Sequence, residues 1–101
     1  MTDKKDIILT YTDGSVYEGE VVDGLKEGFG TLIYPANAKN GRKKYVGEWK
    51  NDRILGKGMM EYQDGALFEG VIYDDELKGV GTVTFPDGSI YSGEVRHEKY
   101  N

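Results

Sequence analysis

The stretch YVGEWKNDRILGKGMMEYQDG at residues 45–65 decides the fold, because its pattern occurs two more times in the chain. The other copies are YEGEVVDGLKEGFGTLIY at 17–34 and FEGVIYDDELKGVGTVTFPDG at 68–88. In each copy an aromatic residue stands two positions before a glycine, a Gly-x-Gly starts eleven residues after that aromatic, and a second aromatic follows after seventeen. Self-similarity at a fixed period is typical of repeat architectures, so we expect tandem copies of one structural unit.

The pattern extends beyond these three copies toward both ends of the chain. We therefore expect a half repeat at 6–16, full repeats at 17–44, 45–67 and 68–90, a half repeat at 91–96 and a tail at 97–101. The first repeat is longer than the others because five residues are inserted within ANAKNGRKK at 36–44. The whole chain is thus expected to form one repeat domain.

Polar and apolar residues alternate with period two through each copy, which is typical of β-strands. Asp-Gly pairs at 13–14, 64–65 and 87–88 favour tight reversals, and DGLKE, NDRIL and DDELK are expected to form longer links within the units. The sequence predicts an all-β fold: a single-layer, elongated antiparallel meander of about eight strands built from hairpin repeats, with essentially no helix. The expected strands are 6–11, 15–22, 28–34, 43–50, 57–62, 66–73, 80–85 and 89–96.

Alternation also places most aromatic residues on one face, together with the paired strand glycines. An aromatic ring lies flat over a neighbouring strand only where that strand has no Cβ, so the glycines are expected to form slots that receive rings from adjacent repeats. The structural glycines are Gly19, Gly28, Gly30, Gly47, Gly56, Gly58, Gly70, Gly79, Gly81 and Gly93.

These residues resemble the MORN repeat family (membrane occupation and recognition nexus), whose unit is similar to YEGEWKNGKxxGxGxxxYxDGSxY. The resemblance covers residues 10–96. Asp52 and Asp75 replace a loop glycine that Gly24 retains, so two loops are expected to differ in shape, and Val71 replaces a glutamate. The resemblance implies a twisted sheet with a grooved face. In the family such arrays serve as interaction and scaffolding modules, often in cytoskeletal, ciliary or membrane-junction assemblies.

The leading hypothesis is a non-catalytic adaptor or scaffold, a small subunit of a larger intracellular assembly. Its aromatic groove would bind a helix or peptide of a partner protein, because exposed aromatic patches usually mark interfaces. The residues expected to contact the partner are Tyr17, Tyr34, Tyr45, Trp49, Tyr62, Phe68, Phe85 and Tyr91. The competing interpretation is that these rings only fill the glycine slots. The open edges of the sheet also allow a homo-oligomer.

An alternative function is peripheral binding to phosphoinositides or other anionic lipids through the basic loop Lys39, Arg42, Lys43 and Lys44. The net charge of −5 over 101 residues makes non-specific nucleic-acid binding unfavourable. The absence of Cys and the single His97 leave no thiol chemistry and no paired-histidine metal site. We expect no enzyme activity, cofactor or metal, and the sequence indicates neither a secretion signal nor a membrane span.

Overall fold

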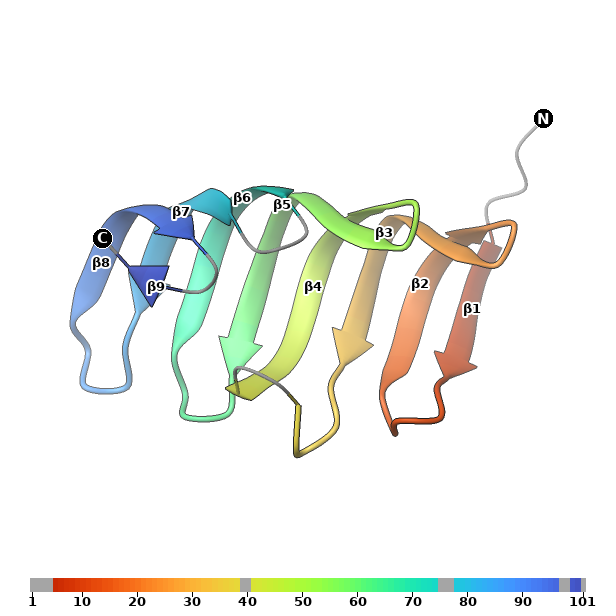
Figure 1. Ribbon diagram of the computed structural model, residues 1–101, viewed down its shortest axis with the longest axis horizontal. Helices are drawn as coiled ribbons and strands as arrows, with labels where there is room; N and C mark the ends of the chain where they lie inside the picture. Colours follow the sequence, from red (N-terminus) through yellow and green to blue (C-terminus); the bar gives the residue numbers. More distant parts are fainter. Residues whose placement is uncertain (1–4, 39–40, 75–77, 97–98, 101) are drawn as a thin grey trace.

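A computed structural model describes residues 5–38, 41–74, 78–96 and 99–100, which form one open antiparallel sheet (Figure 1). Each strand pairs with the next strand in the sequence, so the order in the sheet is β1 to β9. The strands are β1 (Lys5–Thr10), β2 (Val16–Val22), β3 (Leu25–Ile33), β4 (Arg42–Lys50), β5 (Arg53–Tyr62), β6 (Leu67–Asp74), β7 (Lys78–Thr84), β8 (Ile90–Arg96) and β9 (Lys99–Tyr100).

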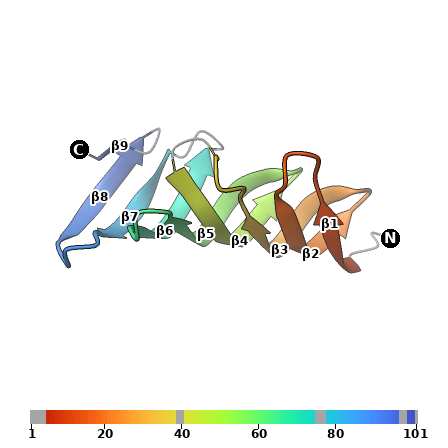
Figure 2. The same ribbon diagram turned by 90° about the horizontal axis from the view of Figure 1, so that it is seen from below.

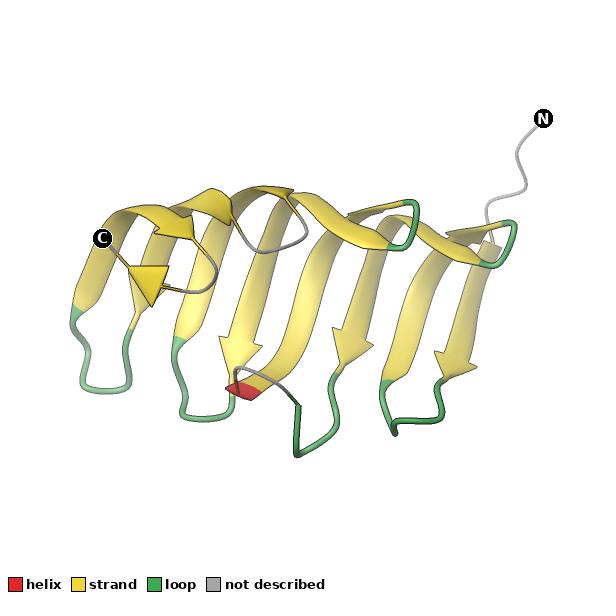
Figure 3. Ribbon diagram, viewed as in Figure 1, coloured by secondary structure: helices red, strands yellow, loops and turns green. Residues whose placement is uncertain are grey.

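The all-β, single-layer meander predicted from the sequence is confirmed. Figure 3 shows strands over most of the described chain, with one short helical segment at Gly41 beside the start of β4. The short strand β9 falls in the expected tail and pairs with Val95 and Arg96, so it adds to the eight strands that were predicted.

The links inside the first two repeats are tighter than the sequence predicted. Strands β3 and β5 begin at Leu25 and Arg53, and only two residues separate each of them from the strand before it. The turn residues Asp23 and Gly24 have φ angles of 53° and 79°, and Asn51 and Asp52 have 48° and 72°. Two consecutive positive φ angles give a two-residue hairpin turn whose twist matches that of the strands. The expectation of longer links was therefore wrong for DGLKE and NDRIL, whereas DDELK lies partly outside the described residues.

A bulge follows each of these tight turns on the second strand of the hairpin. Between the pairs Gly19–Gly30 and Val21–Lys26, β3 has three residues where β2 has only Glu20. Strand β5 repeats this irregularity opposite Glu48. Gly28 and Gly56 lie in the bulges with φ angles of 88° and 107°, which side-chain-bearing residues rarely adopt.

A glutamate of the preceding strand stabilises each bulge. Glu20 Oε1 accepts a hydrogen bond from Phe29 N at 2.7 Å, and Glu48 Oε1 accepts one from Lys57 N at 2.9 Å. In the third hairpin Val71 replaces this glutamate, and β6 pairs with β7 in regular register through Val71 and Val80; the irregularity of this pairing lies instead between Ile72 and Asp74 of β6. The bulge is thus present in the two hairpins that have the glutamate and absent from the described pairing at the position that lacks it.

We therefore expect Glu48→Ala to destabilise the protein by about 1–2 kcal/mol, because a charged acceptor of a backbone amide is lost. Urea unfolding measures this change, and amide hydrogen exchange should be faster at Lys57. Glu69→Ala is the matched control, since Glu69 is an exposed glutamate of β6 that lies on the same face of the sheet. Equal effects of the two substitutions would contradict the role given to Glu48.

One row of glycines crosses seven strands of the sheet. In the backbone register each glycine lies opposite the next, in the order Gly19, Gly30, Gly47, Gly58, Gly70, Gly81 and Gly93. Figure 1 shows that the upper ends of the strands, where the tight turns lie, bend away from the plane of their lower parts, and Figure 2 shows the layer from below. Aromatic rings lie over glycines of this row. The bent layer measures 44 × 27 × 18 Å.

The bent layer buries its own core on the inner face. The core consists of Tyr17, Val21, Tyr45, Trp49, Ile54, Met60, Tyr62, Ala66, Phe68, Ile72, Val83 and Val95. The outer face is mixed: polar side chains share it with exposed apolar residues, among them Ile8, Phe29, Val71 and Val80. A single sheet therefore encloses an apolar core without a second layer, although domains usually need two.

Candidate functional site

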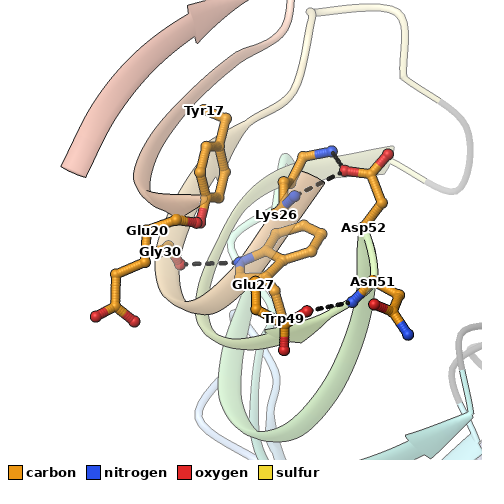
Figure 4. Close-up of polar contacts among 8 residues, drawn as sticks. All are labelled: Tyr17, Glu20, Lys26, Glu27, Gly30, Trp49, Asn51 and Asp52. Carbon is orange, nitrogen blue, oxygen red and sulfur yellow. Dashed lines mark hydrogen bonds and ion pairs between the residues drawn. The ribbon is translucent and has the colours of Figure 1, made fainter. Parts of the chain in front are cut away.

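Trp49 lies at the centre of the aromatic core. The rings of Tyr17 and Tyr45 meet its indole edge-on, with centroid separations of 5.6 Å and 5.4 Å. Trp49 Nε1 donates a hydrogen bond to Gly30 O at 3.1 Å, which connects the second repeat to the first (Figure 4). Such edge-to-face contacts are favourable beyond the area they bury.

The tyrosine rings cover glycines of their own hairpins. A Cβ on Gly30 would overlap the ring of Tyr17, and a Cβ on Gly58 would overlap the ring of Tyr45. The expectation that adjacent repeats supply these rings was wrong for these two slots, because each of the two is filled from within its own hairpin. The adjacent repeat instead contributes Trp49, which packs against the ring already in the slot.

Hydrogen bonds fix the hydroxyl groups of two tyrosines, one buried and one half-buried. Tyr17 Oη donates to Glu20 O at 2.7 Å, and Tyr91 Oη donates to Glu94 O at 2.6 Å. Burial, followed by the negative charge of Glu20, raises the pKa of Tyr17 to about 12. Burial also raises the pKa of Tyr45. The hydroxyls of Tyr17 and Tyr45 therefore remain protonated at neutral pH and act as hydrogen-bond donors rather than as acid–base groups.

A lysine that the sequence did not single out lies beside these rings. Lys26 is only 8% exposed, and its Nζ is 4.8 Å from the centroid of the Tyr11 ring and 5.2 Å from that of Trp49. Its ammonium group pairs with Asp52 Oδ1 at 3.0 Å. The aromatic faces and the carboxylate together compensate for the burial of this charge. The alternation placed position 26 in a link, so no sequence signal separated Lys26 from the exposed lysines.

Asp52 anchors the turn of the second repeat on the first. Its backbone N donates to Lys26 O at 2.8 Å, and its Oδ1 accepts from Lys26 N at 3.1 Å. Beside it, Asn51 N donates to Glu27 Oε1 at 3.0 Å. Burial alone would raise the pKa of Asp52, but the hydrogen bonds and charge of Lys26 outweigh it and lower that pKa. The loop at 51–52 keeps the conformation of the loop at Gly24, so the expected difference in shape was wrong there; Asp75 lies outside the described residues.

The eight aromatic residues predicted to contact a partner separate into two groups. Five are buried inside the chain: Tyr17, Tyr45, Trp49, Tyr62 and Phe68. The other three, Tyr34, Phe85 and Tyr91, are half-buried and pack against the edge of the core. Contact with a partner stays a prediction, and only the second group presents a substantial ring surface for it.

Two residues that were not among the predicted contacts continue this half-buried surface. Tyr11 and Leu32 line a hollow of about 400 Å³ together with Lys26 and the turn that follows β1. We call Tyr11, Leu32, Tyr34, Phe85 and Tyr91 the aromatic strip. Within the described residues of this region, the side chains offer apolar surface and hydrogen bonds, and the buried ammonium of Lys26 is neutralised by Asp52.

Three of the four residues of the predicted basic loop are described by the structure, and Lys39 lies outside the described residues. The guanidinium of Arg42 lies 5.8 Å from the centroid of the Tyr34 ring. Lys43 Nζ is 3.6 Å from Glu61 Oε2, and both side chains are substantially exposed. Lys44 is half-buried on the outer face. Two of these cations are thus near groups of the chain itself, and Arg42 and Tyr34 form one surface.

A profile of the MORN repeat family matches residues 17–39, 45–67 and 68–90. The chain is also similar to Alsin from Rattus norvegicus, with 38% identity over 68 residues, and to Alsin from Homo sapiens, with 37%. These alignments cover 67% of this chain but only 4% of Alsin. Protein TIC 100 from Arabidopsis thaliana is 41% identical over 51 residues, which are 50% of this chain and 5% of that protein. Among the described residues, no helix has the length and apolar character needed to span a bilayer.

Proposed function

The chain belongs to the MORN repeat family, and we propose that it is a protein-interaction module that holds an apolar helix or peptide of a partner along its aromatic strip. MORN repeats are generally non-catalytic modules for protein or membrane interaction. The finer role that we propose is that of an adaptor or scaffold within a larger assembly. The observation that carries the proposal is that half-buried rings remain along the rim of a core that is otherwise closed.

The rigidity of the rim supports this role. Tyr91 is held by the hydrogen bond from its hydroxyl to Glu94 O, and Tyr34 packs against the core beside the guanidinium of Arg42. Rings that are already ordered lose little conformational entropy when a partner binds, which favours affinity. Tyrosine is also enriched among the residues that dominate binding energy at interfaces.

The charges next to Tyr34 indicate the chemistry of the partner. Arg42 and Lys43 stand beside a hollow of about 350 Å³ that is lined by Ile33, Tyr34, Ala36, Lys43 and Gln63. An apolar side chain of the partner would enter this hollow, and an acidic side chain next to it would pair with the two cations. We therefore propose an apolar segment flanked by acidic residues.

Selection from a displayed peptide library tests this proposal, because no partner need be known beforehand. The peptides should be apolar with flanking Asp or Glu, and Tyr34→Ala and Phe85→Ala should each weaken their binding at least tenfold. Tyr73→Ala is the matched control: Tyr73 is half-exposed near the end of β6 and is not part of the aromatic strip, so its removal should leave binding unchanged. Thermal unfolding of each variant verifies that the fold is retained.

The same proteins distinguish the anionic-lipid alternative. Co-sedimentation with phosphatidylcholine vesicles that contain 4,5-bisphosphorylated phosphatidylinositol measures lipid contact. If the triple variant Arg42→Glu, Lys43→Glu, Lys44→Glu abolishes vesicle binding, and the library yields no peptide that depends on Tyr34 and Phe85, the protein-binding proposal is overturned in favour of lipid contact. Peptide binding without vesicle binding supports the aromatic strip.

A further inference from the structure

Strand β1 forms one outer edge of the sheet, and within the described residues it pairs with β2 alone. Tyr11 N donates to Ser15 O at 2.9 Å, so the hydrogen-bonded pairs of β1 with β2 fall on odd-numbered residues. The N–H and C=O groups of the even-numbered residues Asp6, Ile8 and Thr10 therefore point away from β2. They offer a complete hydrogen-bonding edge to a further strand.

We propose that two copies of this chain form a symmetric dimer through β1. The strands pair antiparallel about a two-fold axis at Ile8, so that Ile8 faces Ile8 of the second copy, Ile7 faces Leu9, and Asp6 faces Thr10. This register brings the outward-pointing backbone groups of the even-numbered residues into hydrogen-bonded pairs. It also keeps each side chain opposite a residue on the same face of the sheet.

The sequence of the strand is complementary to itself in this register. From Asp6 to Thr10 it reads polar, apolar, apolar, apolar, polar, with Ile8 at the centre. Ile8 is 66% exposed, and in the dimer it packs against Ile8 of the second copy. On the inner face, Ile7 and Leu9 already pack against the core, so the pairing joins the two cores. An isologous contact of this kind closes after two copies.

Continuation of the repeat from β8 of one copy to β1 of the next is disfavoured. In that arrangement Ile7 would face Gly93, at the position that Gly30, Gly58 and Gly81 hold in β3, β5 and β7. A Cβ on Gly30 would overlap the ring of Tyr17, and a Cβ on Gly81 would overlap the backbone of β6, so the Cβ of Ile7 would be crowded against β8 in the same way. Strand β9 also pairs with the end of β8.

Light scattering across a concentration series tests the proposal. The wild-type protein should approach twice the mass of one chain and no more. Ile8→Lys places two ammonium groups opposite each other and should raise the dissociation constant at least tenfold. Ile90→Lys is the matched control, since Ile90 is equally exposed at 66% on β8 and the dimer should persist. Ile8→Pro removes an outward-facing amide without removing a bond to β2, so it should also give a folded monomer.

A cysteine at the axis tests the register. The chain has no Cys, so Ile8→Cys should form a single disulfide between copies on oxidation, whereas Ile90→Cys should not. A monomer at every concentration, or a dimer that withstands both Ile8→Lys and Ile8→Pro, would overturn the proposal. Species larger than two that disappear in Ile90→Lys would overturn it in favour of the head-to-tail arrangement. Because the aromatic strip is not altered, peptide binding by these variants is a separate result.

Discussion

Replacing Gly58 with alanine is expected to lower the free energy of unfolding by about 3 kcal/mol, which is a large part of the 5–15 kcal/mol that stabilises a typical domain. The added Cβ would overlap the ring of Tyr45, which is fully buried and packs edge-on against Trp49. The ring has no space into which to move, so the strand or the core must shift. Thermal unfolding followed by circular dichroism should show a decrease in Tm of about 15 °C.

A double-mutant cycle separates the overlap from the intrinsic effect of alanine. When Tyr45→Leu has already removed the ring, Gly58→Ala should cost less than about 1 kcal/mol, which gives a coupling of about 2 kcal/mol between the two positions. Gly24→Asn is the glycine control, because nothing lies within 4 Å of its added Cβ and Asn tolerates a positive φ. Additive effects of Tyr45 and Gly58 would show that the ring does not require the glycine.

The sequence was sufficient to predict the repeat, the antiparallel meander and the pairing of glycines with rings. These features depend on local alternation and on one steric requirement, the absence of a Cβ beneath a ring, which is visible as a spacing of residues. The tight turns could have been inferred from Asp23-Gly24, but Asn51-Asp52 is a weaker signal. Its left-handed conformation is supported by contacts with Lys26, which belongs to another repeat.

The bulges and the site could not be predicted from the sequence, because they also depend on contacts between residues that lie apart in the chain. Glu20 and Glu48 recur at one repeat position, but their role depends on an amide nine residues further along the chain that a bulge turns toward them. Lys26 lies in a stretch whose polar composition is typical of an exposed link, and its burial depends on Tyr11, Trp49 and Asp52 together. Which rings are buried depends on the bend of the sheet, which no single repeat specifies.

The second large effect on the free energy of unfolding is expected at Trp49. The size of this effect shows whether Trp49 is a core residue or a surface residue that anchors a partner. Its side chain is 5% exposed, so Trp49→Ala should cost about 3–5 kcal/mol with no partner present.

Trp49→Phe keeps an apolar ring between Tyr17 and Tyr45 but removes the hydrogen bond to Gly30 O, so it should cost less, about 1–2 kcal/mol. Tyr73→Ala, at a side chain that is 50% exposed, should cost under about 1 kcal/mol. Urea unfolding monitored by circular dichroism measures all three, because Trp49 is the only tryptophan and its fluorescence is lost in two of the variants. If Trp49→Ala proved as mild as Tyr73→Ala, the indole would not be part of the core. The aromatic strip would then have to be extended to include it.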